Sequence, residues 1–434
     1  MDITSPFAGL FRSARTVSAL SAAGLRASLS AAGVRSDADD PARLAATLGA
    51  LRGLLAKAGQ WLAHVPDVLP PSYAEALETL QQQAPPMGPT FVRRRMAAEL
   101  GPAWRRRFAA FDEKPVSDAS LGQVHHARLA DGREVACKLQ YPAMDAAIRS
   151  DLLQVRLLAS AWQRIDGAVD PEAALADIAE RLEAETDYLT EARALRLFGA
   201  ALEGVASVPT SIREATTRRL LTMTWLEVRP FSAWAASVPS QTERDAHGLA
   251  LFRAWYIPFF RVGAIHADPH PGNHGIVADG QPALYDFGSF RLFPAFFVQG
   301  VWTLREALRR GGDTGEAYAL WGFSGLSQEA RAALDRWAGW VYEPLLRAGP
   351  GPMVADPAVG VSLLGAVAKV LRAAGGVRPP REFPLFDRAA LGLGTSLWRL
   401  GAQADWGSAF EEIVAAWPID GLEVRQETAW DGTR

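Results

Sequence analysis

The hydrophobic pattern predicts a helical beginning, a small sheet and a long helical second half. Helices are expected at 41–65, from Ser72 onward, from Thr90 to Gly101, at 142–165 and at 171–200. Strands are expected from 108 to 141, at 205–213 and at 218–226. From Thr242 the pattern is helical again, apart from short strands beside Asp279 and Gly280. The order of these elements predicts an α+β fold.

Four regions follow from this pattern. They are a basic segment at 1–40, a helical extension at 41–107, a strand-containing lobe at 108–227 and a mostly helical lobe at 228–434. Asp40 before Pro41 is a strong helix-start signal, which sets the first boundary. Within the second region, Ser72 and Glu75 form a capping-box pattern that opens another helix.

Composition sets the outer limits on function. The chain has 434 residues, of which 49% are hydrophobic, so it is long enough to bury a core in two lobes. Its net charge of −3 argues against a nucleic-acid partner. The single cysteine, Cys137, has no partner for an intrachain disulfide, and the strand alternation beside it predicts a core position.

The first forty residues differ from the rest of the chain. From Ile3 to Ser36 there is no acidic residue, while four arginines recur among apolar positions. Three interpretations stay open: a loosely ordered start, an amphipathic helix on an anionic membrane surface, and a transit peptide. An arginine-rich chain with four lysines is typical of a GC-rich bacterial genome, which weakens the third interpretation. We therefore expect a cytoplasmic protein, with peripheral contact to the inner membrane surface as the alternative.

No apolar run approaches the roughly 20 residues of a membrane-spanning helix. The longest candidate, 357–368, contains two glycines and is followed by Lys369. A bilayer span is therefore not expected.

The strongest chemical signal is a set of three polar residues in the second half. Asp268 precedes Asn273 by five residues, and Asp286 follows in an Asp-Phe-Gly sequence. A kinase catalytic loop has this interval between the Asp that orients the phosphoryl acceptor and the Asn that binds metal. The pattern predicts a Mg-ATP site in which Asn273 and Asp286 hold Mg²⁺ and Asp268 orients or activates the acceptor.

Upstream residues supply the rest of a kinase-like set in the expected order. Lys138 lies in a strand-like Val-Ala-Cys-Lys run, and Glu191 lies in the following helical stretch, where it can orient the lysine toward the phosphates. Asp187 lies four residues before Glu191, so on a helix the two share one face. Met223 and Leu226 lie in the expected hinge that meets the adenine.

Taken together, the ordered motifs resemble the UbiB/AarF family of atypical kinases. They are Lys-Ala-Gly-Gln at 57–60, Ala-Ser-Leu-Gly-Gln-Val-His at 119–125, Val-Ala-Cys-Lys, Glu-Thr-Asp at 185–187, His-Ala-Asp-Pro-His-Pro-Gly-Asn and Asp-Phe-Gly. The resemblance extends from about Pro41 to Ala307. It implies a protein-kinase-like bilobal fold with a helical N-terminal extension.

The resemblance also implies roles for several of these residues. Lys57 and Gln60 on the extension would face Glu185 and Asp187, in the place where a conventional kinase docks a peptide. Ala119 and Ser120 would contact the phosphates, although Ser117 and Asp118 depart from the family's run of alanines. No Ala-Pro-Glu follows Gly288 before the Pro294-led helix, which also argues against protein substrates.

These patterns predict an ATP- and Mg²⁺-dependent atypical kinase or slow ATPase. The resemblance implies a lipid or quinone-like small molecule as the acceptor, in support of quinone or isoprenoid metabolism. Two alternatives stay open. The first is a non-catalytic pseudokinase scaffold that uses ATP as a conformational ligand. The second is a small-molecule phosphotransferase.

Overall fold

The computed structural model describes residues 87–119, 121–142, 186–267, 271–323, 325–354, 357–373 and 382–433. The chain divides into two compact units. The first unit comprises Met1–Tyr188 and Glu214–Thr222, and the second comprises Leu189–Arg213 and Met223–Arg434. Three elements cross a boundary between the units: α8 (Tyr188–Ala201), the 3₁₀ turn η3 (Arg213–Ala215) and β5 (Leu220–Thr224).

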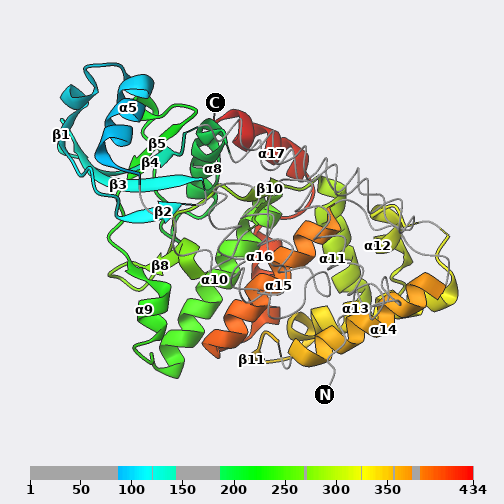
Figure 1. The fold of residues 1–434 in the computed structure, drawn as a ribbon. Coiled ribbons are helices and arrows are strands. Elements are labelled where there is room, and N and C mark those ends of the chain that lie inside the picture. Colours follow the sequence, from blue (N-terminus) through cyan, green and yellow to red (C-terminus); the bar gives the residue numbers. More distant parts are fainter. Residues whose placement is uncertain are drawn as a thin grey trace, which may run out of the picture. The chain divides into compact units, whose positions relative to one another are not determined.

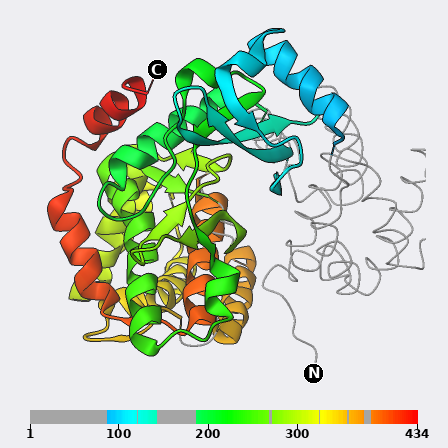
Figure 2. The ribbon, with the colours of Figure 1, turned by 90° about the vertical axis from the view of Figure 1, so that its left-hand side faces the viewer.

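The described part of the first unit is a five-stranded sheet with one helix beside it (Figures 1 and 2). Its elements are α5 (Pro89–Leu100), the 3₁₀ turn η2 (Trp104–Arg107), β1 (Phe108–Phe111), β2 (Ser117–Ala119), β3 (Gly122–Leu129), β4 (Glu134–Gln140) and β5 (Leu220–Thr224). The strand order is β1-β3-β4-β5, and β2 also pairs with β3. The predicted helix from Thr90 to Gly101 and the predicted strands from 108 to 141 are thus confirmed.

The β3–β4 hairpin forms where the sequence places its turn signal. The register runs from Gly122 opposite Gln140 to Arg128 opposite Glu134. Gly132 has a φ of 94°, a left-handed value that glycine adopts without strain. The side chain of Asp131 accepts a hydrogen bond from the Arg133 amide at 3.1 Å, which closes the turn.

A β-bulge in β1 brings two aromatic rings to the same side of the sheet. Phe108 and Phe111 are three residues apart, so a regular strand would direct them to opposite faces. The register shifts between Phe108 and Ala110, and the two rings meet edge-to-face at 5.5 Å. The ring centroid of Trp104 lies 6.0 Å from that of Phe108 and 5.2 Å from that of Phe111. This aromatic cluster anchors the edge of the sheet.

The second unit is mostly helical. Its helices are α8 (Tyr188–Ala201), α9 (Phe231–Ala235), α10 (Gln241–Val262), α11 (Ala295–Arg310), α12 (Gly315–Leu320), α13 (Gln328–Leu346), α14 (Pro357–Ala373), α15 (Phe383–Leu400), α16 (Trp406–Ala416) and α17 (Leu422–Asp431), with the 3₁₀ turn η4 (Pro271–Asn273). Its short strands are β6 (Arg229–Pro230), β7 (Ala264–His266), β8 (His274–Ile276), β9 (Pro282–Leu284), β10 (Phe290–Leu292), β11 (Gly351–Pro352) and β12 (Gln403–Ala404). They form the pairs β7–β10 and β11–β12 and the three-stranded sheet β6-β8-β9.

Helix α10 runs through the core of this unit, beside α15 and α16 (Figure 1). It begins at a capping box, in which Ser240 and Glu243 satisfy each other's backbone amides. One face carries Phe252, Phe259 and Phe260, all fully buried. The helix ends at Gly263 in the left-handed conformation, where the chain turns into β7. The helix predicted from Thr242 is therefore confirmed. Strands β8 and β9 confirm the short strands predicted around Asp279 and Gly280.

A glycine in helix α11 gives a test of this packing. A Cβ at Gly300 would lie 2.2 Å from Nε1 of Trp321, which donates a hydrogen bond to the Phe297 carbonyl. We expect Gly300→Ala to lower the free energy of unfolding by about 1–3 kcal/mol through overpacking. At Gly339 in α13 a Cβ would meet no atom within 4 Å, so Gly339→Ala should raise stability by up to about 1 kcal/mol. Urea unfolding of both variants checks the contrast, and equal midpoints would contradict it.

Two local expectations are wrong. The strand expected at 205–213 is absent: in this described stretch only isolated bridges occur, from Ser207 to Ala283 and from Ser211 to Met223. Helix α8 begins at Tyr188, so Asp187 precedes the helix and does not share a helix face with Glu191. The predicted strand at 218–226 is confirmed as the shorter β5.

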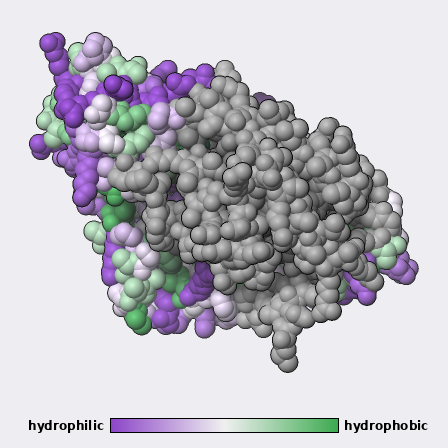
Figure 3. All heavy atoms as spheres, in the orientation of Figure 1, coloured by the Kyte–Doolittle hydropathy of each residue, from purple (hydrophilic) through white to green (hydrophobic). Residues whose placement is uncertain are grey.

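The described surface over the first unit is mostly hydrophilic in the view of Figure 3, where the region of α5 and β1 lies at the upper left. Its charges include ion pairs of Glu113 with Arg93 and Arg105. These pairs are solvent-exposed and contribute little to stability.

Candidate functional site

Two predicted metal ligands lie at adjoining strand ends in the second unit. Asn273 ends η4 immediately before β8, and Asp286 lies two residues after the end of β9. Strands β8 and β9 pair antiparallel, with His274 opposite Leu284, and the Tyr285 amide donates to the Asn273 carbonyl at 3.2 Å. Both side chains are half-buried. The hairpin thus brings together an amide and a carboxylate that are thirteen residues apart in sequence.

Tyr285 fixes the backbone around Asn273. Its hydroxyl donates to the carbonyl oxygens of Gly272 and His274, at 3.0 and 3.2 Å. Burial, with the neighbouring charge of Asp286, raises the pKa of this hydroxyl, so it remains a donor at neutral pH. Sequence reasoning did not identify this residue, because a tyrosine before Asp-Phe-Gly carries no distinctive signal.

The backbone of Asp286 is held by His266. Nε2 of His266 lies 2.6 Å from the Asp286 carbonyl oxygen, and because a carbonyl accepts only, Nε2 carries the proton. The Gly288 amide donates to Oδ1 of Asp286 at 3.0 Å. Strand β10 pairs with β7, with Phe290 opposite His266. Asp286 is therefore fixed from both sides before any ligand binds.

A cluster of aromatic rings connects this segment to helix α8. Phe287 is fully buried, 4.8 Å from Phe198 of α8 and 5.1 Å edge-to-face from His266. Phe198 also meets Phe290 at 6.3 Å. These contacts connect α8 directly to the Asp-Phe-Gly segment.

Glu191 lies in the first turn of α8 with 4% of its surface exposed. A Cβ at Gly288 would lie 3.2 Å from Oδ1 of Asp286 and 3.6 Å from Oε2 of Glu191. Two carboxylates thus approach the same glycine, which favours a cation nearby. The lack of a side chain at Gly288 leaves room for this approach.

Lys138 lies in β4 of the first unit, opposite Val124, with 6% of its surface exposed. Its ammonium lies 5.4 Å from the ring centroid of Tyr188, within cation–π range. The neighbouring Cys137 is fully buried, and burial raises the pKa of its thiol to about 12, which confirms the predicted core position. Lys138 and Glu191 belong to different units, so their pairing stays a prediction.

Two polar residues of the 119–125 motif have a structural role. Gln123 and His125 are fully buried in β3. The Met87 amide donates to Oε1 of Gln123 at 2.9 Å, the Gln123 amide nitrogen lies 2.7 Å from Nε2 of His125, and Nδ1 of His125 lies 2.8 Å from the Asp112 carbonyl. One tautomer satisfies every contact, with Nδ1 protonated. Burial lowers the pKa of His125, which keeps the ring neutral.

The remaining predicted residues are divided between described and undescribed parts. Lys57, Gln60, Ser120, Glu185 and Asp268 lie outside the described residues. Ala119 ends β2 opposite Gly122 and is half-buried.

The other three described candidates lie near the ends of α8 and β5. Asp187 forms an ion pair with Arg218 at 3.1 Å within the first unit. Met223 is buried in β5, and Leu226 is half-buried in the segment that follows. Neither position contradicts the expected hinge.

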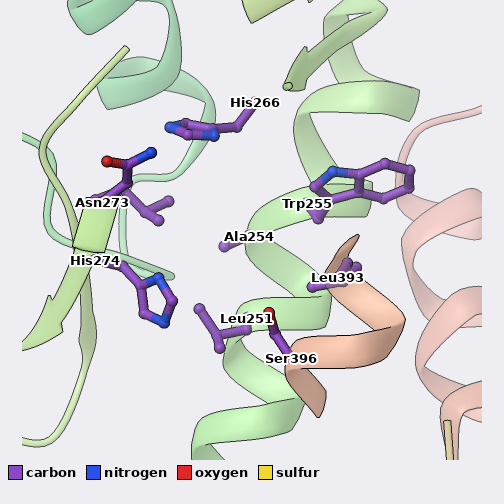
Figure 4. Close-up of a pocket in the computed structure, with 9 residues that line it drawn as sticks. Leu251, Ala254, Trp255, His266, Asn273, His274, Leu393 and Ser396 are labelled. Atoms are coloured by element: carbon purple, nitrogen blue, oxygen red, sulfur yellow. The ribbon is translucent and has the colours of Figure 1, made fainter. Parts of the chain in front are cut away.

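A small cavity lies behind Asn273, among α10, α15 and β8 (Figure 4). It has a volume of about 30 Å³ and is lined by Leu251, Ala254, Trp255, His266, Asn273, His274, Leu284, Leu393 and Ser396. Nε1 of Trp255 is buried without a hydrogen-bond partner among the described residues, and it lies on the ring edge nearest His266. This volume suits water and is too small for a nucleotide. The cavity is therefore not the nucleotide site.

We expect another buried histidine, His247, to make the stability of this unit depend on pH. His247 has 3% of its surface exposed, lies 4.8 Å from Trp234, and neither ring nitrogen has a partner in the described part. Burial, and secondarily the charge of His274, lowers the pKa of His247 from 6.5 to about 4. The unfolded chain therefore binds this proton at a higher pH than the folded chain.

We expect stability to fall by about 3 kcal/mol as the pH drops from 6.5 to about 4, because protonation then favours the unfolded chain. His247→Phe keeps the ring stacking and removes the titration. Urea unfolding across this range should show a shallower loss in the variant. Identical pH profiles would show that His247 does not cause the loss.

Known proteins resemble this chain along much of its length. Residues 79–309 match the family model of the ABC1 atypical kinase-like domain. The chloroplastic protein ACTIVITY OF BC1 COMPLEX KINASE 8 of Arabidopsis thaliana is 34% identical over 241 residues, which is 54% of this chain and 32% of that protein. The mitochondrial atypical kinase COQ8 of Saccharomyces cerevisiae is 37% identical over 180 residues, 41% of this chain and 36% of that protein.

The matched segments thus span about a third of these two relatives. A solved structure, the complex of Rv3197 with erythromycin from Mycobacterium tuberculosis, is 28% identical and superposes with a TM-score of 0.62. That likeness covers 85% of this chain and 94% of the mycobacterial chain. With its kinase-like mixture of helices and strands, the chain belongs to the ABC1 atypical kinase-like family.

Proposed function

We propose that the chain binds Mg-ATP and transfers the γ-phosphoryl group to water or to the hydroxyl of a lipid-like small molecule. The observation that carries this proposal is the placement of Asn273 and Asp286 at adjoining ends of the β8–β9 hairpin. Their amide and carboxylate oxygens are ligands of the kind that Mg²⁺ prefers. The hydrogen bond from His266 holds Asp286 in place before the ligand arrives.

The roles of the other residues follow from their chemistry. Lys138 contacts the α- and β-phosphates, Glu191 orients Lys138, and Asp268 orients the attacking hydroxyl. Bound Mg²⁺ supplies charge neutralisation on the phosphates. Because phosphoryl transfer depends mainly on positioning and electrostatics, a carboxylate with an ordinary pKa is sufficient at position 268.

The proposal includes a two-lobed kinase arrangement with a helical N-terminal extension. Its regions are 1–40, 41–107, 108–227 and 228–434. Lys57 and Gln60 on the extension face Glu185 and Asp187, and Ala119, Ser120, Met223 and Leu226 contact the nucleotide. An extension in this position excludes peptides, which favours a small acceptor.

A quinone-like or isoprenoid lipid is the acceptor class we propose, with residues 1–40 in contact with an anionic membrane surface. The four arginines of that segment, and the absence of acidic residues from Ile3 to Ser36, support the contact. Among the described residues, no helix has the length and apolar character needed to span a bilayer. The protein would then reach its substrate from the membrane surface.

Phosphate release from Mg-ATP, with and without anionic liposomes, tests this function. We expect turnover that liposomes increase and that Asp286→Asn removes. If wild type and variant release phosphate equally under both conditions, the enzymatic proposal fails. Tight ATP binding without turnover would then favour the scaffold alternative.

A macrolide is a second candidate ligand. The mycobacterial structure that covers 85% of this chain holds erythromycin. Incubation with erythromycin and Mg-ATP, followed by mass spectrometry, distinguishes two outcomes. A phosphorylated macrolide would support the phosphotransferase alternative, while unmodified erythromycin would leave it without a substrate.

A further inference from the structure

Helix α17 contacts helix α8, which lies far away in the sequence. The guanidinium of Arg193 lies 3.7 Å from the ring centroid of Trp430 and donates to the Trp430 carbonyl at 2.9 Å and to the Thr433 hydroxyl at 3.2 Å. Arg196 donates through Nε to the Thr433 carbonyl at 3.1 Å. Thr433 has 4% of its surface exposed. Two arginines of α8 therefore bind the end of α17 through stacking and charge-assisted hydrogen bonds.

The same helix is fastened to the segments that enter the candidate site. Gln426 donates through Nε2 to the carbonyls of Val262 and Phe293, at 3.1 and 2.9 Å. Its amide lies against Gly263, where the Cβ of any other residue would clash with Nε2 of Gln426. The Trp430 ring also lies 5.7 Å from that of Phe290.

These contacts give α17 an unusual position. It contacts three elements: α8, the end of α10, and β10. Helix α8 carries Glu191, α10 leads into β7, and β10 follows Asp286. In Figure 1, α17 lies beside α8 and β10, as the contacts require. One helix thus links the three elements that position the chemistry of the second unit.

We propose that α17 acts as a brace that positions Glu191, with Trp430 and Thr433 as positioning residues acting through Arg193 and Arg196. The inference rests on the proposed function, because it concerns the geometry of the same site. Glu191 lies two residues before Arg193 and five before Arg196, so a shift of the clamped turns displaces its carboxylate. Misplacement of a catalytic group by about 1 Å can reduce a rate about 100-fold.

Electrostatics explain why α8 needs this brace. Burial, followed by the charges of Arg213 and Arg193, lowers the pKa of Arg196. Three guanidinium groups near one another repel, and the acceptors on Thr433 and Ser211 offset that repulsion. Without Thr433 and Trp430, the turn of α8 that follows Glu191 would lose its partners on α17.

Hydrogen exchange of the nucleotide-free protein tests the brace directly. We expect Trp430→Ala to accelerate hydrogen exchange of the α8 amides about tenfold or more. In this variant, local opening of α8 no longer has to break the contact between Arg193 and the Trp430 ring. Trp398→Ala, which removes an indole that is 45% exposed on α15, is the matched control and should leave α8 unchanged. Unchanged α8 exchange in Trp430→Ala would overturn the inference, whatever the activity of the protein.

A double-mutant cycle tests whether the brace acts through Glu191. Trp430→Ala should reduce the rate of phosphate release about tenfold in the wild-type background and less than about twofold in a Glu191→Gln background, because coupled residues are not additive. Trp430→Phe, which keeps a ring under Arg193, should restore most of the rate. Equal reductions in both backgrounds would overturn the inference. Wild-type protein without turnover would instead contradict the proposed function, and the exchange experiment would still decide on the brace.

Discussion

Asp286→Asn is expected to weaken Mg²⁺-dependent ATP binding by about 100-fold or more, the largest change in affinity that we predict. The substitution removes the negative charge that Mg²⁺ requires but retains Oδ1, which accepts the Gly288 amide at 3.0 Å. The fold of the segment should therefore survive. Calorimetric titration with ATP, in the presence and absence of Mg²⁺, measures the change.

Asp279→Asn is the matched control for this experiment. Asp279 lies in the turn of the same β8–β9 hairpin, is exposed, and accepts the Gln281 amide at 3.0 Å through Oδ1. The turn is at the opposite end of the hairpin from Asn273 and Asp286, so the same chemical change is made without altering the site. Mg-ATP affinity should stay at the wild-type value. If Asp286→Asn also binds Mg-ATP as wild type does, Asp286 is not a metal ligand.

Local signals were sufficient to predict helix α5 and the β3–β4 hairpin. Helix α5 follows Gly88 and stops at Gly101, which has a φ of 87°. The β3–β4 hairpin follows from Asp131 and Gly132, whose turn chemistry is encoded in two adjacent residues. In each case the information that sets the boundary lies within a few residues of it.

Predictions failed where tertiary contacts decide. The segment 205–213 has strand-like composition, yet Ser207 and Ser211 bridge two different partners, Ala283 and Met223, so no continuous ladder forms. Asp187 lies outside α8 and pairs with Arg218 from a distant part of the first unit. None of these three partners, Ala283, Met223 and Arg218, can be identified from the sequence next to the residue it contacts.

The candidate site shows the same division. The intervals between Asp268, Asn273 and Asp286 were readable because phosphoryl-transfer chemistry imposes them. The sequence did not identify Tyr285 and Phe198 as the residues that hold this site in place. An aromatic residue in a helix or beside a strand usually belongs to the core. Their contribution depends on rings and carbonyls that only the folded chain brings together.

Asp268→Asn is expected to reduce the rate of phosphate release by about 10²–10⁴-fold while Mg-ATP affinity stays near the wild-type value. In the proposed mechanism, Asp268 acts on the attacking hydroxyl, whereas Asn273, Asp286 and Lys138 hold the nucleotide. A neutral amide keeps the size of the side chain but loses its basicity. Single-turnover phosphate release together with calorimetric titration separates the two quantities.

The same variant decides between an enzyme and a scaffold. A scaffold that uses ATP only as a conformational ligand needs Asn273 and Asp286 but has no use for a base at position 268. Loss of turnover with retained affinity would therefore place the chain among the phosphoryl-transfer enzymes. A wild-type protein that binds Mg-ATP, and whose residual phosphate release does not change in Asp268→Asn, would favour the scaffold, since Asp268 would then have no acceptor to orient.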